Sequence, residues 1–311
     1  MNRDNWADLL DENIRTVYHL TESGVEQMRS RIFHTETSSS DDEKDSAASG
    51  LSKLVETAEG ESISYEDAKQ GYDVRYIHKK FSKGIKITEE MYEDDQTNVM
   101  KKMPSALARS KVFTMEQSAA DIFNHGFTAG GGGLAAFTSG DGAALFSASH
   151  TSSALPTLVQ GNLTTADLDE DSLEVALVTM RATKDEKGEL MLVQPDVLLV
   201  APALEKEARI LVESMQRTGT ANNDINPYKG KLEVVVWDYL GTAAGGSDTA
   251  WFVLDSTQHS LNWFTRKDTG IVGPSMDDSF DNEIAKWKVS CRWSVGFSDW
   301  RGVYGSLGDN S

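Results

Sequence analysis

The segment from residue 69 to residue 88 combines a high positive charge with an alternating apolar pattern. Apolar side chains alternate with polar ones over 72–76 and again over 85–87, which is the period-two pattern of half-exposed strands. Phe81–Gly84 lies between the two runs, and its glycine permits a turn there. The pattern therefore predicts a long β-hairpin. Because two strands bury too little surface to be stable alone, something else must cover this hairpin.

The charges around this hairpin are segregated by sign. Between residues 69 and 86 the only acid is Asp73, and the basic side chains are Lys69, Arg75, Lys79, Lys80, Lys83 and Lys86. Five acids follow within seven residues: Glu89, Glu90, Glu93, Asp94 and Asp95. One exposed ion pair contributes only about 0.2–1 kcal/mol, but repeated pairs fix register and the choice of partner. We therefore predict that the basic residues from Arg75 onward meet these acids across copies of the chain. The alternative is a solvated, charged hairpin.

The first 68 residues are acidic and contain little that forms a core. They carry 16 acidic and 6 basic side chains, a net charge of −10. The run Thr35–Ser46 holds no apolar residue, so it cannot bury surface to offset the entropy of being ordered. A short amphipathic patch precedes it, made of Trp6, Leu9, Leu10, Ile14 and Val17. We interpret residues 1–60 as an extended arm that orders only against another subunit; the alternative is a frayed terminus.

Beyond residue 100, helical and strand-like patterns follow one another irregularly. Apolar residues at spacings of four and three predict a helix from near Pro104 to near Gly126. Acids ahead of an apolar stripe predict a second helix after about residue 169, and Pro202 opens a third. Strands are predicted at 196–200, 232–237, 251–254 and, as the final strand, 287–295. Because this order lacks a regular βαβ alternation, the predicted fold class is α+β.

Composition excludes several classes of protein. The 311 residues carry 49 acidic and 30 basic side chains, and a formal net charge of −19 repels phosphate. Cys291 is the single cysteine, which excludes an internal disulfide framework and a multi-cysteine metal site. No apolar stretch approaches the roughly 18 residues of a membrane span, and residues 1–6 lack the apolar run of a secretory signal. We expect a soluble, acidic protein of a reducing cytoplasm, without a membrane partner.

Motifs that carry chemistry are sparse. The glycine run Gly130–Gly133 lacks the lysine and hydroxyl of a phosphate loop, and no two histidines have metal-ligand spacing. Asp141 with His150 is a candidate acid–base or metal pair, for which a local structural role is the alternative. Cys291 is a candidate nucleophile, although its apolar neighbours favour ordinary burial. A weaker cation candidate consists of Asp277, Asp278, Asp281 and Glu283.

From this sparse chemistry we predict no catalytic residue, no cofactor and no metal site. A folding chain with long appendages, segregated charge and no reactive centre favours a protein that assembles with copies of itself. Two other classes stay open. One is a hydrolase that uses Cys291, or Asp141 with His150, and the other is a monomeric binding module.

Several segments resemble the major capsid proteins of tailed phages, in the Mu-type major head subunit group. They are residues 119–127, 140–150, 195–208, 222–228, 232–236, 251–254 and 300–306. Their order and spacing carry the resemblance, which implies the fold named after phage Hong Kong 97. In that fold we expect an N-terminal arm, an extended β-hairpin loop, a spine helix, a peripheral domain and an inserted axial domain. The corresponding ranges are 1–60 for the arm, 61–90 for the loop, 91–194 for the spine helix and first peripheral part, 195–270 for the axial domain and 271–311 for the second peripheral part.

The resemblance also implies a function without catalysis, that of a major capsid protein of a tailed bacteriophage or prophage. Copies of such a protein assemble as pentamers and hexamers into an icosahedral shell that encloses double-stranded DNA without sequence-specific binding. Because the chain begins at Met1 without room for a scaffolding region, we expect a separate scaffolding protein, together with a portal and a maturation protease. We expect the protein in the virion, after assembly in the cytoplasm of the bacterial host. An encapsulin-like protein nanocompartment shell is the alternative within the same fold.

Overall fold

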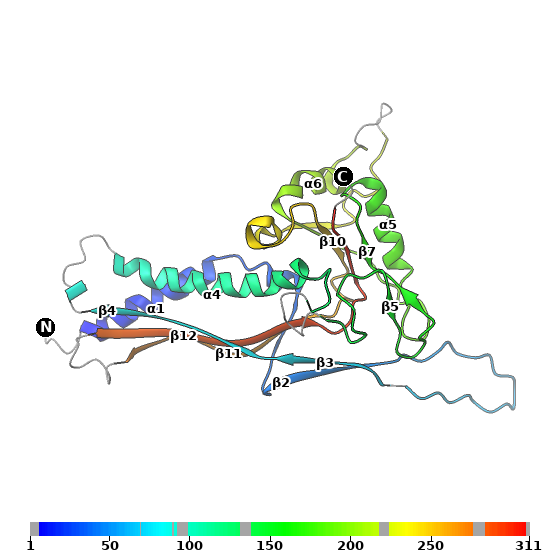
Figure 1. The fold of residues 1–311 in the computed structure, drawn as a ribbon, viewed down its shortest axis with the longest axis horizontal. Coiled ribbons are helices and arrows are strands. Elements are labelled where there is room, and N and C mark those ends of the chain that lie inside the picture. Colours follow the sequence, from blue (N-terminus) through cyan, green and yellow to red (C-terminus); the bar gives the residue numbers. More distant parts are fainter. Residues whose placement is uncertain are drawn as a thin grey trace. The chain divides into compact units, whose positions relative to one another are not determined.

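The computed structural model describes residues 6–68, 70–88, 90–91, 99–130, 138–217, 224–275 and 284–308. The chain forms two compact units, each built from three segments. The first unit comprises Met1–Asp42, Ile77–Ala119 and Trp263–Ser294, and the second comprises Glu43–Tyr76, Ala120–Asn262 and Val295–Ser311. Figure 1 labels the helices and strands of both units.

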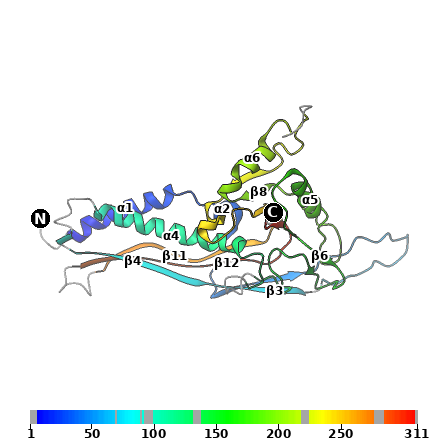
Figure 2. The ribbon, with the colours of Figure 1, turned by 45° about the horizontal axis from the view of Figure 1, so that its top comes forward.

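The first unit is a four-stranded sheet with two helices on one face (Figures 1 and 2). In sheet order its strands are β1 (His34–Thr37), β11 (Leu261–Ser275), β12 (Ile284–Phe297) and β4 (Lys79–Thr88). The covering helices are α1 (Trp6–Gly24) and α4 (Val99–Asn124), and a short helix, α2, spans Arg29–Ile32. Helix α1 is tied to the sheet at two points. The guanidinium of Arg15 donates to the carbonyl of Ile271 at 3.0 Å, and the indole of Trp287 donates to Asp11 at 2.9 Å.

The helix predicted from apolar spacing is confirmed as α4. The sequence predicted Pro104 in the first turn of this helix. The helix instead begins at Val99, so Pro104 lies inside it. Its buried apolar residues follow the predicted stripe: Leu107, Ala108, Val112, Met115, Ala119, Ala120, Ile122 and Phe123. The burial of this stripe against the sheet and the core, more than intrinsic propensity, stabilises the helix.

The hairpin predicted within residues 69–88 is wrong. Strand β3 (Gln70–Ile77) pairs with β2 (Asp42–Ala48), whereas β4 pairs with β12, so the two alternating runs belong to different sheets. The predicted turn, Phe81–Gly84, lies inside β4. Glycine is favoured at 84 because a Cβ there would lie 3.0 Å from the carbonyl oxygen of Trp287, which is tighter than most Cβ contacts. A close approach of two backbones therefore explains this glycine, and a turn does not.

His78 separates β3 from β4 and is buried. Its two ring nitrogens pair with the hydroxyls of Ser38 and Ser294, each at 3.0 Å. In β3 the buried positions are even-numbered, Val74 and Tyr76, whereas in β4 the one buried position is odd-numbered, Ile87. The sequence pattern alone attributes this change of phase to a turn, but the structure attributes it to a change of sheet.

Residues 6–48 of the acidic N-terminal segment are folded within the chain, which corrects for this part the expectation that residues 1–60 order only against another subunit. Ile14 and Tyr18 of α1 are buried in the first unit. Much of the apolar-free run Thr35–Ser46 forms strands, since β1 pairs with β11 and β2 pairs with β3. Backbone hydrogen bonds, which an argument from composition does not count, order this run.

The second unit contains one five-stranded sheet and two smaller ones. In sheet order the five strands are β7 (Leu163–Thr164), β13 (Val303–Ser306), β10 (Trp251–Leu254), β8 (Val197–Val200) and β9 (Glu233–Val236). The small sheets pair β2 with β3, and β5 (His150–Thr151) with β6 (Val159–Gln160). The helices are α5 (Glu170–Arg181), α6 (Glu205–Glu213), η4 (Pro202–Leu204), η5 (Asp238–Leu240) and η6 (Thr242–Ala244).

The strands predicted after residue 195 are confirmed as β8, β9, β10 and β12, although β13 follows the predicted final strand. Helix α5 begins where the acids predicted it, because Asp169 accepts a hydrogen bond from the backbone N–H of Ser172 at 2.7 Å. Within the five-stranded sheet, β8 pairs with β10 in the antiparallel direction and with β9 in the parallel direction. The predicted α+β class is confirmed.

An aromatic cluster forms part of the core of the second unit. The ring of Phe123 lies 5.1 Å from that of Phe252 and 6.2 Å from that of Trp237, between centroids. Phe146 lies 5.1 Å from Phe252 in the same way. All four rings are buried, so the cluster combines apolar burial with favourable edge and offset ring contacts.

Candidate interaction surface

Strand β4 is an edge strand of the four-stranded sheet, and it carries four of the predicted contact residues. Lys79, Lys80, Lys83 and Lys86 are all exposed. The amine of Lys83 donates to the hydroxyl of Ser110 on α4 at 3.0 Å, which places Lys83 on the helix side of the sheet. Lysines are a common protection of a sheet edge, whose unpaired backbone groups would otherwise accept another strand. The charge of β4 is therefore partly explained by its edge position.

The pairing register places further cations beside those of β4. Lys80 lies opposite Arg292, and Lys86 lies opposite Lys286. Like charges directly opposite each other destabilise a sheet, each pair by roughly 0.2–1 kcal/mol. Arg292 has one acidic partner, Asp41, at 3.3 Å. Among the residues that the structure describes, Lys80, Lys86 and Lys286 form no ion pair, so folding itself does not account for these charges.

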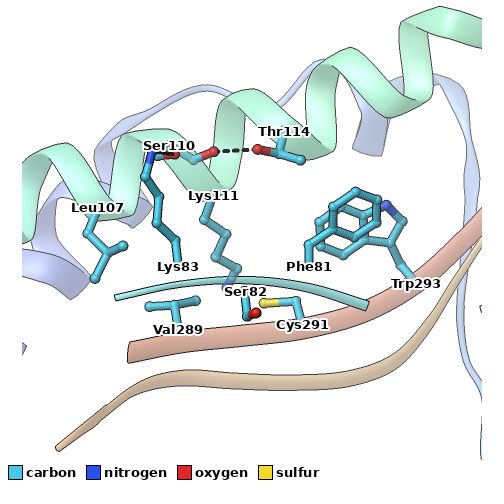
Figure 3. Close-up of a pocket in the computed structure, with 10 residues that line it drawn as sticks. All are labelled: Phe81, Ser82, Lys83, Leu107, Ser110, Lys111, Thr114, Val289, Cys291 and Trp293. Atoms are coloured by element: carbon cyan, nitrogen blue, oxygen red, sulfur yellow. Dashed lines mark hydrogen bonds between the residues drawn. The ribbon is translucent and has the colours of Figure 1, made fainter. Parts of the chain in front are cut away.

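A cavity of about 210 Å³ lies between β4 and α4 in the first unit (Figure 3). Phe81 and Trp293 stack at one end of it, with centroids 4.1 Å apart, and Leu107 lies at the other end. The lining residues are Phe81, Ser82, Lys83, Leu107, Ser110, Lys111, Thr114, Val289, Cys291 and Trp293. The lining is thus half apolar and half polar, and Lys83 reaches from β4 to Ser110 on α4.

A second hollow adjoins this cavity along α4, and both are lined by Ser110 and Thr114. Its charged lining residues are Lys102 and Arg109, both exposed. Phe113 also lines it and is 49% exposed. We call the first cavity the α4–β4 groove; the second hollow is bordered by α4 and, through Val17, by α1. Lys83 was predicted from the sequence, whereas Lys102, Arg109 and Phe113 were not, because cations opposite the apolar stripe of a helix are typical of any solvated face.

A buried charge network adjoins the cavity, because Lys111 lines the cavity and belongs to the network. The amine of Lys111, whose side chain is 5% exposed, forms ion pairs with Glu22 of α1 and, at 2.6 Å, with Asp268 of β11. Burial by itself lowers the pKa of Lys111, but the hydrogen bonds to both carboxylates outweigh it and raise the pKa. Burial raises the pKa of Asp268, but the hydrogen bond and charge of Lys111 outweigh it and hold the pKa below its usual value. Lys111 and Asp268 therefore stay charged over a wide pH range.

Cys291 lies beside this network and is buried. Burial, reinforced by the charge of Asp268, raises the pKa of its thiol to about 12. The thiol donates to Asp268 at 3.4 Å. A nucleophilic cysteine needs its thiolate near neutral pH, so this environment supports the apolar burial that the sequence analysis favoured.

Asp141 and His150 do meet, in the second unit. Asp141 lies 2.9 Å from Nδ1 of His150, the other ring nitrogen lies 3.2 Å from the side-chain oxygen of Asn162, and the ring stacks on Trp300 at 4.4 Å. Both members of the pair are almost fully buried. Burial raises the pKa of Asp141, but the hydrogen bond from His150 outweighs it and lowers the pKa. The ring of His150 therefore joins Asp141, Asn162 and Trp300, which is a structural role.

The other predicted residues are distributed as follows. Arg75 lies in β3 of the second unit, and Glu90 is exposed two residues after β4. Glu89, Glu93, Asp94 and Asp95, Gly131–Gly133 and the cluster from Asp277 to Glu283 lie outside the described residues. In the described part of the chain no three histidine, cysteine, aspartate or glutamate side chains are grouped so that they could hold a metal ion. No described helix is both long and apolar enough to cross a membrane.

The segment that leaves the body of the second unit is the chain between β2 and β3, residues 49–68 (Figure 1). We call it the extended loop. From residue 51 to residue 68 every side chain is exposed. Its apolar members are among the most exposed in the chain: Leu51, Leu54, Val55, Ile63 and Tyr65. The projecting segment predicted at 61–90 thus lies earlier in the chain, by 12 residues at its start and 22 at its end.

The base of the extended loop is fixed by one turn of the second unit. Lys53 pairs with Glu189 at 2.7 Å, and Glu66 pairs with Lys187. Glu66 also accepts from the backbone N–H of Ser52 at 2.8 Å, which joins the outgoing and returning chains. The hydrogen bonds from Lys187 and Ser52 lower the pKa of Glu66 to about 2. These contacts lie at the base, so the loop between residues 54 and 65 extends beyond them.

Comparison with known proteins places this geometry in a family context. Residues 71–306 match the family described as phage capsid protein. A search of curated proteins found no match. A solved structure of the bacteriophage JBD30 capsid decorated with minor capsid protein trimers matches with a TM-score of 0.56 at 14% identity, over 70% of this chain and 92% of that one. A structure of Mycobacterium phage Bobi matches with a TM-score of 0.53 at 14% identity, over 92% of each chain. The capsid structure of cyanophage P-SCSP1u matches with a TM-score of 0.54 at 14% identity, over 88% of this chain and 85% of that one. At these identities the matches establish the fold, and the expected Hong Kong 97 type fold is confirmed.

Proposed function

The chain belongs to the phage capsid protein family, and from this premise we propose that its copies assemble as pentamers and hexamers into an icosahedral shell that encloses double-stranded DNA. It is a structural protein of the virion, the major capsid protein of a tailed phage or prophage. The proposal adds that the shell forms in the cytoplasm of the bacterial host. A separate scaffolding protein, a portal and a maturation protease take part, and the DNA is held without sequence-specific contacts.

The observation that carries this proposal is the extended loop. Leu54 is 101% exposed, Tyr65 92% and Ile63 70%, on a segment that has no core of its own. Each large apolar side chain gains about 1.5–3 kcal/mol when it is fully buried. A subunit repeated by symmetry supplies neighbours that can bury them. The loop therefore supports a chain whose surface is completed by identical copies.

We propose the five-part division of the family for this chain, with changed boundaries. The spine helix is α4, and the arm ends before β2 instead of at residue 60. The extended hairpin loop is moved from 61–90 to β2, β3 and the chain between them. The axial domain begins at residue 195 and ends near residue 262 instead of 270, because β11 belongs to the sheet of the first unit; β7 and β13 extend the axial sheet from outside that range.

We also propose that the charged residues around β4 are inter-subunit contacts. They are Arg75, Lys79, Lys80, Lys83 and Lys86, with Glu89, Glu90, Glu93, Asp94 and Asp95 on the acidic side. The unpaired lysines of β4 and the like-charge register with β12 support this, because an acid from another copy would relieve both. The role is structural and involves no catalysis or cofactor, which the raised pKa of Cys291 and the enclosed ring of His150 support.

Electron microscopy of particles purified from a producing bacterium tests the proposal. We expect closed shells of uniform size that contain DNA when the portal and helper proteins are present, and empty shells when they are absent. Shells filled with a cargo enzyme in place of DNA would support a protein nanocompartment and contradict this function. Particles that never exceed single subunits, with all helper proteins supplied, would contradict it as well.

The double variant Lys80→Glu with Lys83→Glu is expected to fold but to impair assembly. Both side chains are exposed, so the free energy of unfolding should change by less than about 0.5 kcal/mol. Each reversal turns a favourable inter-subunit contact into a repulsion, and this repeats at every subunit of the shell. Circular dichroism checks the fold and sedimentation measures the assembled fraction. A variant that yields normal particles in normal amounts excludes β4 as a contact.

A further inference from the structure

His150 is buried in the second unit with a hydrogen-bond acceptor at each ring nitrogen. Its side chain is fully enclosed, and that of Asp141 is 3% exposed. Nδ1 of the ring lies 2.9 Å from a carboxylate oxygen of Asp141, and Nε2 lies 3.2 Å from the side-chain oxygen of Asn162. A neutral imidazole has one N–H and satisfies one of these acceptors, whereas an imidazolium has two and satisfies both. The proton count of the ring therefore follows from how firmly each partner is held as an acceptor.

The orientation of Asn162 is fixed by the backbone groups around its amide. The amide nitrogen donates to the carbonyl oxygens of Leu145 at 2.9 Å and Val303 at 3.1 Å. The amide oxygen accepts from the backbone N–H of Ser147 at 2.9 Å. Turning the amide over would set its oxygen against two carbonyl oxygens and its nitrogen against an N–H. Nε2 of His150 therefore faces an oxygen and has to donate.

Asp141 is held as a carboxylate in the same way. Its oxygens accept from the backbone N–H groups of Ala143 at 3.0 Å and Thr151 at 3.3 Å. Burial raises the pKa of Asp141, but hydrogen bonds, of which that from His150 is the strongest, and the charge of His150 outweigh it and lower the pKa. A carboxylate has no proton to give, so Nδ1 has to donate as well.

We propose that His150 carries both ring protons as a buried imidazolium, and that the second unit loosens when pH rises far enough to remove one of them. We call His150 with Asp141 and Asn162 the His150 joint. The joint connects segments that are far apart in sequence, because the ring also stacks on Trp300. Loss of either proton would set two lone pairs against each other and leave the carboxylate of Asp141 buried without its counter-charge. This inference is independent of the proposed function.

The other charged groups around the ring are paired with one another. The guanidinium of Arg301 lies 5.1 Å from the centroid of the Trp300 indole on which the ring stacks. Arg301 forms ion pairs with Asp299 and Glu186, each at 2.9 Å. Asp141 is therefore left to balance the imidazolium.

The His150 joint should make the stability of the second unit fall as pH rises. A histidine of an unfolded chain gives up its second proton near about pH 6.5. Above that pH a folded chain with an intact joint binds one proton more than the unfolded chain, and stability falls with pH wherever the folded state binds more protons. The contribution of the joint is thus complete at lower pH and is lost on alkalisation.

Nuclear magnetic resonance of the unassembled subunit, labelled with ¹⁵N in its histidines, counts the protons directly. At about pH 7.5, one unit above the value for an unfolded chain, we expect both ring nitrogens of His150 to carry a bonded proton. The signal is assigned by its change in Asp141→Asn and by its loss in His150→Gln. One protonated and one bare nitrogen at this pH overturns the proposal.

Asp141→Asn keeps the shape of the joint and removes its need for a second proton. The new amide nitrogen can donate to Nδ1 of a neutral ring, while Nε2 still donates to Asn162. Between about pH 6 and pH 9 we expect the unfolding equilibrium constant of the wild type to rise at least about tenfold more than that of the variant. Urea denaturation at each pH measures both.

Asp171→Asn is the matched control for Asp141→Asn. It removes an exposed carboxylate at the start of α5, in the same unit, and should keep the wild-type dependence on pH. Equal dependence on pH in the wild type and in Asp141→Asn overturns the proposal. Should Asp141→Asn fail to fold, the proton count of the wild-type ring still decides.

Discussion

Replacing Lys111 with methionine should lower the free energy of unfolding by about 3 kcal/mol, because it leaves Glu22 and Asp268 without their shared cation. Methionine preserves most of the length and apolar stem of the side chain, so the effect reports the charge and not a cavity. The two carboxylates are 22% and 37% exposed, which places the loss at the lower end for buried ion pairs. Helix α1, which holds Glu22, should lose protection from amide hydrogen exchange before the rest of the first unit does.

Lys102→Met on the same helix is the matched control for Lys111→Met. Lys102 is exposed, so its replacement should change the free energy of unfolding by less than about 0.5 kcal/mol. Urea denaturation followed by circular dichroism compares the two. Equal stability of the two variants would show that the network does not hold α1 in place.

The same network sets a dependence on pH. The pKa of Asp268 is lower in the folded protein than in the unfolded chain, so its contribution is complete above the unfolded value of about 4 and is lost as pH falls through the folded value. The pKa of Lys111 is raised, so its contribution is complete below the unfolded value and is lost only as pH rises through the folded value. Wild type should therefore lose more stability than Lys111→Met on acidification below pH 4.

Phe123→Ala should lower the free energy of unfolding of the second unit by about 3–5 kcal/mol. The ring is fully buried between Phe146, Phe252 and Trp237, and its removal leaves a cavity among rigid aromatic side chains that cannot collapse to fill it. Phe113→Ala, the same change ten residues earlier on the same helix, removes a ring that is 49% exposed and should cost less than about 1.5 kcal/mol. Thermal or urea denaturation measures both. Similar losses in the two variants would contradict the assignment of Phe123 to the core.

The sequence predicted elements whose cause is local. Apolar spacing located α4, and the acids that cap and precede α5 located its first turn. Short apolar runs located β8, β9 and β10. In each case the residues that form the element also carry the pattern that reveals it, because helices and buried strands select side chains by periodicity.

Prediction from the sequence failed for elements whose conformation depends on residues far away in the chain. β4 pairs with β12, whose residues follow about two hundred positions later, and no feature of residues 69–88 identifies that partner. Gly84 is present for an approach to Trp287 that only the folded structure contains. Pairing of backbones also orders the apolar-free run that contains β1 and β2, which composition alone would leave unfolded.

The candidate site was predicted in part for the same reason. Lys79, Lys80, Lys83 and Lys86 could be recognised as an unusual charge in an acidic chain. Arg109 and Phe113 could not, because their importance depends on the neighbouring helix α1, whose Val17 lines the same hollow. The projecting segment was placed at 61–90 because an alternating basic pattern resembles a hairpin more than the acidic, patternless residues 49–68 do.

Amide hydrogen exchange of residues 51–68, compared between dissociated subunits and assembled shells, tests the central claim most directly. Every side chain of this segment is exposed in the single chain, so its amides, apart from the hydrogen-bonded ones of Ser52, Ala58 and Glu61, should exchange in the subunit at nearly the rate of an unfolded peptide. On assembly the exchange of this segment should slow at least about tenfold, as a neighbouring copy covers it. Equal exchange in both states would show that other copies leave the loop uncovered, and would contradict the account.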